Sequence, residues 1–421
     1  MPISTSISKR CLAWSTALLA TVAVSMALAS TAAAGGYAQG LQGASSAGVS
    51  GAMTGRADTP EAGYYNPAGW ALQDDWGASV GGSGLLPFVY HEAPDGARTR
   101  AEVDGAFPPF AHGFVRIGEV AAGVSVGVPY GASLQWPDDW EGRFEATGSR
   151  FQAVEAAPSL AWRPADWLAV GGGPRLVWST IGFERRIDFA RDDDSEEGIA
   201  RLDASAPGLG AQFGVWGQFH DLWSAGASWR SGIDLEYSGV GEFEGVPPEM
   251  EENIHDSRAT TEMTLPHRFA VGVAYEVMAM GVISLDVEYS LWSVYDTFQV
   301  EFESEDVQDI ADERNWENTL SMRAGAEYVA PVDGLVIRSG ISYEPSPAPE
   351  DAASAAQPDT DRTTTSFGVG YQAIDYIEVD LAYNLSILSR TGSSGQSLGG
   401  AYDGQIHAIS AGLRFRPPAG R

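Results

Sequence analysis

Cysteine and lysine are almost absent from this chain of 421 residues, which contains only Cys11 and Lys9. A disulfide framework and a thiolate metal site are therefore excluded. Cations are scarce in general, since 25 lysines and arginines stand against 56 acidic residues and the net charge is −31. Nucleic acids and anionic headgroups both bind to clustered cations, so neither is an expected partner. The six histidines are scattered without a ligand-like or triad-like grouping, and we expect no metal and no cofactor.

Long apolar runs are equally rare. The run from Leu12 to Ala29 follows Lys9 and Arg10 and leads into small residues up to Ala34. This order is typical of a secretory signal peptide, which we expect at residues 1–34; polar residues within the run disfavour the alternative of a membrane anchor. After Ala34 no stretch approaches the ~20 apolar residues of a membrane-spanning helix. The exported protein is then periplasmic, secreted or an outer-membrane barrel.

The remaining chain is rich in apolar and polar residues that alternate. The pattern is clear in residues 283–292, 377–384 and 409–415. Such a period of two places one face of a strand against apolar surroundings and the other against water. Marking these segments predicts about fourteen strands, most of them with the roughly 9–11 residues that cross a membrane. Aromatic residues near strand ends fit an interfacial girdle: Trp76, Trp167, Trp223, Trp292, Trp316, Tyr343 and Tyr402.

The predicted connections alternate between short turns and long loops. The long loops are strongly acidic, with six acids in residues 241–258 and eight in residues 301–317. Outer-membrane barrels have short periplasmic turns and long external loops, and their closure leaves no unpaired sheet edge in lipid. We therefore predict an all-β fold, an antiparallel transmembrane barrel of about 14 strands over residues 75–416. Residues 417–421 would form a short C-terminal tail.

Residues 35–74 do not fit this ladder of strands. Gly40 to Gly55 consists almost entirely of small residues, and Thr59-Pro60-Glu61 has the character of a helix start. Asn66-Pro67 does too, with asparagine as the cap and proline at the first helical position. This segment is either a tether or a plug, and its low charge favours a plug.

Several segments resemble the FadL family of outer-membrane transporters for hydrophobic compounds. Tyr64 to Gly69 resembles the Asn-Pro-Ala motif of that family's N-terminal hatch, and Val128-Pro129-Tyr130-Gly131 with Trp140 to Phe144 is similar to its third strand and the following loop. Residues 265–296 and 326–362 resemble later strands of that family. Two features depart from the family: six residues follow Phe415, and the loops are heavily acidic.

The resemblance implies a barrel closed by a hatch over residues 35–74, with hydrophobic cargo captured among the outer loops and released sideways through the wall. Cargo would be long-chain fatty acids or aromatic hydrocarbons, moved passively by a monomer that meets outer-membrane lipids and, during biogenesis, the assembly machinery. The implied residues are Tyr65, Asn66, Pro67 and Ala68 in the hatch, Gly127, Pro129, Tyr130 and Gly131 at the lateral opening, and Trp136, Trp140, Phe144, Phe189, Phe243 and Met250 for capture.

Other interpretations stay open at this point. Pro129 cannot donate to a β-ladder and marks an edge or bulge, so a simple strand-end bulge competes with a lateral opening. Asn66 is either a helix cap alone or also part of a plug, and residues 192–197 are either a solvated loop or a divalent-cation site. A general diffusion porin and a barrel enzyme such as a phospholipase are the alternative functions. We expect no enzyme, because Gly123 to Gly127 matches a nucleophile elbow only by letters and lies within a strand.

Overall fold

The structure is a computed structural model that describes residues 36–102, 106–189, 197–277, 280–303, 310–349, 354–389 and 398–417. The expected signal peptide, most of the acidic segment 192–197 and residues 418–421 of the expected tail lie outside these ranges. Within them, no helix combines the length and the apolar character that crossing a membrane requires.

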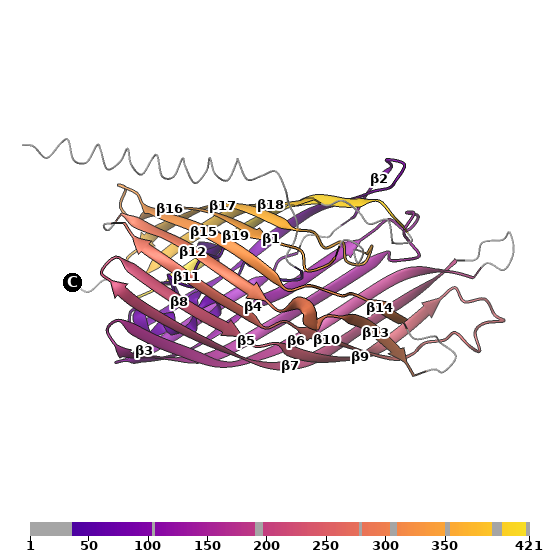
Figure 1. The fold of residues 1–421 in the computed structure, drawn as a ribbon, viewed down its shortest axis with the longest axis horizontal. Coiled ribbons are helices and arrows are strands. Elements are labelled where there is room, and N and C mark those ends of the chain that lie inside the picture. The colour runs from indigo at the N-terminus through magenta and orange to yellow at the C-terminus, as the bar shows by residue number, and fades with distance from the viewer. Residues whose placement is uncertain are drawn as a thin grey trace, which may run out of the picture.

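These residues form one closed antiparallel β-barrel (Figure 1). Its strand segments are β1 (Trp76–Glu92), β2 (Arg98–Arg100), β3 (Pro109–Ile117), β4 (Val120–Gln135), β5 (Gly148–Ala165), β6 (Leu168–Asp188), β7 (Glu197–His220), β8 (Trp223–Arg230), β9 (Ile233–Glu244), β10 (Ser257–Leu265), β11 (Arg268–Glu276), β12 (Gly281–Ser290), β13 (Thr297–Phe302), β14 (Ile310–Glu313), β15 (Thr319–Val329), β16 (Leu335–Glu344), β17 (Arg362–Ile374), β18 (Ile377–Ser389) and β19 (Ala401–Phe415).

The 19 segments make 14 transmembrane strands, because five of the 14 are divided in two: β2/β3, β8/β9, β10/β11, β12/β13 and β14/β15. The barrel closes where β19 pairs with β18 on one side and with β1 on the other. The predicted fold class is thus confirmed. Short turns and long loops alternate as expected, and Figure 1 shows the long loops together at one end.

The distribution of side chains is the reverse of that in a water-soluble protein. Along β5, for example, Leu160 and Trp162 point outward and are more than half exposed, whereas Ser159 and Glu155 point inward and are buried. An apolar exterior and a polar interior are what a barrel in lipid requires. Trp76, Trp167, Trp223 and Tyr343 are exposed, as a girdle requires, whereas the girdle prediction is wrong for Trp292, Trp316 and Tyr402, which are buried.

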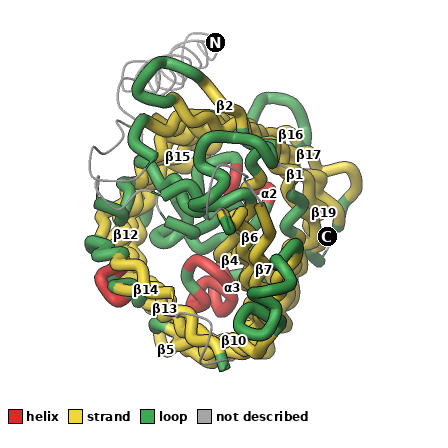
Figure 2. Tube along the Cα trace, turned by 90° about the vertical axis from the view of Figure 1, so that its right-hand side faces the viewer, coloured by secondary structure: helices red, strands yellow, loops and turns green. Residues whose placement is uncertain are grey.

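Residues 36–75, here called the N-terminal segment, lie inside the barrel (Figure 2). They contain the short helices α2 (Ala44–Ala47), α3 (Ala62–Tyr65) and η1 (Pro67–Leu72). Helix α2 packs against β17, β18 and β19, and η1 packs against β5, β6 and β7. Asn66 caps η1 as predicted, since its side chain accepts a hydrogen bond from Ala68 N and Pro67 follows it.

Candidate functional site

Strand β4 separates from its neighbour halfway along its length. Its pairing with β3 ends at Val126, opposite Ala111, while its pairing with β5 continues to Gln135. Between Gly127 and Tyr130 the register to β5 shifts, so β4 carries one residue more than its partner there. Pro129 therefore lies in a β-bulge, as its missing N–H requires. In the described part of the chain, β3 does not follow β4 beyond this bulge.

The N-terminal segment pairs with β4 where β3 ends. Ala38 lies opposite Tyr130 as an antiparallel bridge. Gln39 N donates to Pro129 O at 2.9 Å, and Gly131 N donates to Tyr37 O at 2.9 Å. Because these bonds satisfy the backbone of β4, Tyr37 to Gln39 take the place of a neighbouring strand.

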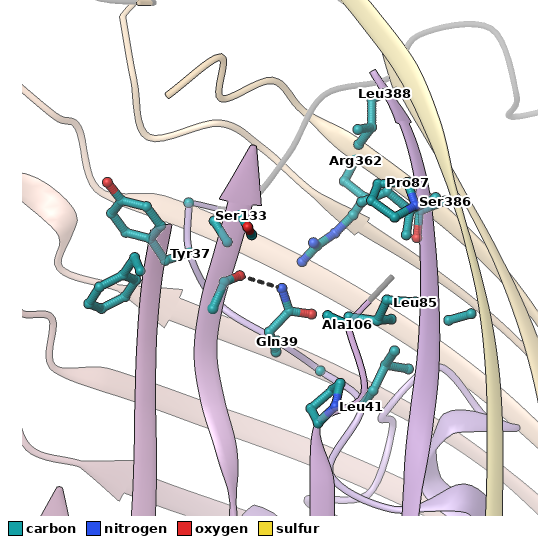
Figure 3. A pocket seen from close by; sticks show the side chains of 18 of the residues that line it. Tyr37, Gln39, Leu41, Leu85, Pro87, Ala106, Ser133, Arg362, Ser386 and Leu388 are labelled. Carbon is teal, nitrogen blue, oxygen red and sulfur yellow. Dashed lines mark hydrogen bonds between the residues drawn. The ribbon is translucent and has the colours of Figure 1, made fainter. Parts of the chain in front are cut away.

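Two glutamine side chains reinforce this pairing. Gln39 Nε2 donates to Gly131 O at 2.7 Å, the bond drawn in Figure 3. Gln42 Nε2 donates to Val128 O at 2.8 Å. A side chain at Gly127 would collide with Gln42, since its Cβ would lie 2.3 Å from Gln42 Oε1. The glycine before the bulge thus permits the close approach of the N-terminal segment.

A cavity of about 490 Å³ adjoins the same stretch of β4. Its lining comes from the N-terminal segment, β1, β4, β5, β16 to β19 and residues 106–108 and 356–359, and is largely apolar. Strand β5 contributes residues from both of its faces: Phe151 is buried, whereas Arg150 and Gln152 are exposed. Phe107, which is 70% exposed, also lines it. The cavity therefore borders residues from both faces of the wall beside β4.

The Asn-Pro-Ala motif lies deep in the barrel. Asn66 is fully buried, and its Nδ2 donates to Thr54 O and to Val215 O, both at 3.0 Å. The Tyr65 hydroxyl donates to Gly40 O at 2.7 Å. Asn66 thus joins two parts of the N-terminal segment to β7, and Tyr65 ties the motif to the residues that lead to β4.

Glu61 connects the start of α3 to α2 within the N-terminal segment. Its carboxylate accepts hydrogen bonds from Ser46 N at 2.8 Å and from the Ser45 hydroxyl at 2.9 Å. Burial raises the pKa of Glu61, and the negative charge of Asp380 raises it further. This carboxylate acts within the segment, between α2 and the start of α3.

Buried arginines and glutamates alternate around the lumen. Glu344 pairs with Arg362 and Arg323, Glu288 with Arg323 and Arg268, and Glu155 with Arg230 and Arg175. Tyr64 of the N-terminal segment fills the space between the two halves of this chain of charges. Its ring lies 4.2 Å from the guanidinium of Arg230, and its hydroxyl accepts from Arg268 at 2.9 Å. The charges of these arginines and glutamates thus compensate one another, as buried charges must.

The six aromatic and methionine residues expected to capture cargo do not gather in one groove. Trp136 and Trp140 are buried and stacked on each other at 4.3 Å. Phe144 is 36% exposed, and the guanidinium of Arg143 lies 4.4 Å from its ring. The remaining three lie elsewhere: Phe189 is buried, Phe243 packs near Phe302 at 6.1 Å, and Met250 is half-buried. None of these six expected capture residues is among the described residues that line the cavity.

Sequence reasoning missed most residues of the cavity. Tyr37, Glu344 and Arg362 line it, yet no local pattern distinguishes them from other residues of their segments. Arg362 belongs to a stretch that resembles the FadL family, but the resemblance assigned it no functional role. The bulge was predictable because proline within a strand leaves few alternatives.

Together these features define an outer-membrane β-barrel whose lumen is occupied and whose wall is interrupted beside a cavity. The chain belongs to the outer membrane protein transport protein family (OMPP1/FadL/TodX), whose model matches residues 25–415. It is 23% identical to outer membrane protein P1 of Haemophilus influenzae over 316 residues, 68% of this chain and 67% of that protein.

Solved structures share the fold. A Pseudomonas aeruginosa FadL homologue superposes with a TM-score of 0.78 at 17% identity, covering 90% of this chain and 99% of the other. The toluene transporter TodX of Pseudomonas putida gives a TM-score of 0.69 at 15% identity, covering 90% and 99%. A monoaromatic hydrocarbon channel, CymD, gives 0.70 at 16% identity, covering 90% and 98%.

Proposed function

We propose that the protein carries hydrophobic small molecules passively across the outer membrane and releases them sideways through the barrel wall beside β4. The observation that carries this proposal is the position of the apolar cavity. It lies against the bulge of β4, and its lining includes residues from both the inner and the outer face of the wall. Cargo that leaves by this route enters the bilayer core without crossing the polar headgroup layer.

The N-terminal segment would act as the hatch in this mechanism. Tyr37 and Gln39 bond to the edge of β4 and line the cavity at the same time. Cargo that enters the cavity therefore touches the residues whose displacement would open the wall. Release needs only local loss of the hydrogen bonds that the N-terminal segment makes to Val128, Pro129 and Gly131, because β4 keeps its pairing with β5.

A general diffusion porin is the weaker alternative. A porin of this strand number needs an open aqueous lumen. Here α2, α3 and η1 lie within the barrel and pack against its wall, which supports a closed transporter (Figure 2).

A reversible crosslink tests the lateral route. Ala38 and Tyr130 face each other in a non-hydrogen-bonded antiparallel pair, whose Cα atoms lie about 4.5 Å apart, within disulfide range. The double variant Ala38→Cys/Tyr130→Cys should fix the N-terminal segment to β4. We expect accumulation of radiolabelled toluene by cells carrying only this transporter to fall at least about tenfold when oxidised, and to recover with a reductant.

A matched crosslink provides the control. Ser83 and Ser410 face each other on β1 and β19, with their hydroxyls 2.7 Å apart, away from the N-terminal segment's pairing with β4. Ser83→Cys/Ser410→Cys should form a disulfide and leave uptake unchanged. Full uptake through the oxidised Ala38–Tyr130 variant would mean that cargo leaves by another path.

A further inference from the structure

The charges around the cavity bear on which class of cargo it accepts. Among the described residues of its lining, the cationic side chains are Arg150 and Arg362, and the acidic ones are Glu344 and Asp359. Arg150 Nη2 lies 2.7 Å from Asp203, on the outer side of the wall. Arg362 points toward the cavity in Figure 3 and is the cation that an anionic cargo would meet inside.

Arg362 already has its partners. Its Nε donates to Glu344 Oε2 at 2.8 Å, its Nη2 pairs with the same carboxylate, and Nη2 also donates to Ala38 O at 3.0 Å. Arg362 is 9% exposed and Glu344 is 7% exposed, so water does little to screen this pair. The other oxygen of Glu344 accepts from Arg323 at 3.1 Å.

A carboxylate entering this cavity would therefore be a second anion competing for one guanidinium. If the ligand displaces Glu344 from Arg362, the buried Glu344 carboxylate keeps only Arg323 as its partner. If Glu344 stays, the two carboxylates lie close together. Both outcomes cost free energy, because like charges at short range in a dry site repel each other. A hydroxyl or an apolar end group does not incur this cost.

We propose that Glu344, by holding Arg362, makes this transporter selective for uncharged hydrophobic molecules over their carboxylate analogues. This inference rests on the proposed function and specifies its substrate class as neutral hydrocarbons and alcohols. Glu344 is the residue that sets specificity, and its removal should create an anion site where none is offered now.

Two ligands that differ only in the end group test the inference. Purified protein in detergent is titrated with ω-brominated dodecanol and ω-brominated dodecanoate, and quenching of tryptophan fluorescence reports binding. Trp316 is a suitable reporter, since its ring lies 5.7 Å from that of Tyr37, which lines the cavity. At about pH 9 the carboxylic acid is ionised. The wild-type protein should bind the alcohol at least about tenfold more tightly than the carboxylate, the factor that one unmade charge-assisted contact is worth.

The variant Glu344→Gln should bind the carboxylate about tenfold more tightly than the wild type, with little change for the alcohol. The positive charge of Arg362 then no longer has the Glu344 carboxylate as its partner and can pair with the ligand. Adding Arg362→Gln should abolish this gain. The matched control is Glu288→Gln, which removes a carboxylate that pairs with Arg268 and Arg323 in the same chain of charges but does not line the cavity. It should leave both affinities unchanged.

The outcomes separate this inference from the function on which it rests. If neither ligand binds to the wild type, the proposed function itself fails. Equal or tighter binding of the carboxylate to the wild type would overturn the selectivity and leave transport intact. A gain in Glu288→Gln as large as in Glu344→Gln would assign the effect to general loosening of the interior charges, which also contradicts a specific role for Glu344. A change in gel mobility on boiling shows for each variant that the barrel has folded.

Discussion

Glycine at the inner face of the wall lets the N-terminal segment lie directly against the barrel. At Gly340 on β16, a Cβ atom would come within 2.4 Å of the backbone carbonyl carbon of Val49. At Gly214 on β7 it would come within 2.1 Å of Asn66 Oδ1. Similar contacts occur all around the lumen, at Gly123, Gly127, Gly171, Gly226, Gly272, Gly325 and Gly368. Part of the high glycine content therefore reflects this close approach of two backbones.

Replacing Gly340 with valine should loosen the N-terminal segment without harming the strand, because β-branched residues suit strands but this one overlaps the backbone at Val49. Overpacking of this kind costs about 1–3 kcal/mol. Hydrogen exchange of the amides around residues 47–52 should accelerate by at least about tenfold, as local opening becomes easier. Gly113→Val is the control, since the nearest atoms to its Cβ lie at 3.8 Å. Unchanged exchange in Gly340→Val would show that the contact does not fix the segment.

At the scale of elements, alternation predicted which segments are strands but not where they are interrupted. Four consecutive strands break near the same level, at residues 231–232, 266–267, 291–296 and 314–318. Near two of these breaks, Trp292 and Trp316 turn inward and pack 5.0 Å apart in the barrel interior. Their spacing in the sequence resembles that of girdle aromatics. They are buried because residues far away in the sequence pack against them inside the barrel. Pro266 was a local signal for one break.

Deleting residues 36–74 should convert a nearly silent barrel into an ion-conducting one. A barrel of about fourteen strands is too wide for its own side chains to fill, so the N-terminal segment occupies the remaining space. Its loss would also leave Arg230 and Arg268 without Tyr64 between them, in a wet lumen. Single-channel recording in planar bilayers provides the measurement. Equal conductance with and without these residues would indicate that the segment does not seal the lumen.

On the scale of the whole molecule, the predictable part of the structure is what lipid and water impose on every strand. The outward apolar face and the unequal loops follow from contact with solvent or bilayer, and each leaves a regular trace in the sequence, while the closed edge follows from the lack of water in lipid. The cavity leaves no such trace. Tyr37, Phe151 and Arg362 come from three distant parts of the chain, and their meeting depends on the register of the closed barrel.

Barrel closure itself can be tested through its last strand. Strand β19 (Ala401–Phe415) pairs with β18 from Ile377 to Ser389 and with β1 from Ala78 to Glu92, so its removal exposes two sheet edges that lipid cannot satisfy. A chain ending at residue 400 should lose the difference in gel mobility between unboiled and boiled samples, because an open sheet does not resist detergent. A chain ending at Pro417 keeps all pairs of β19 and should behave as the full-length protein does. A truncation at residue 400 that remained heat-modifiable would mean that β1 and β18 hold the barrel without their common neighbour.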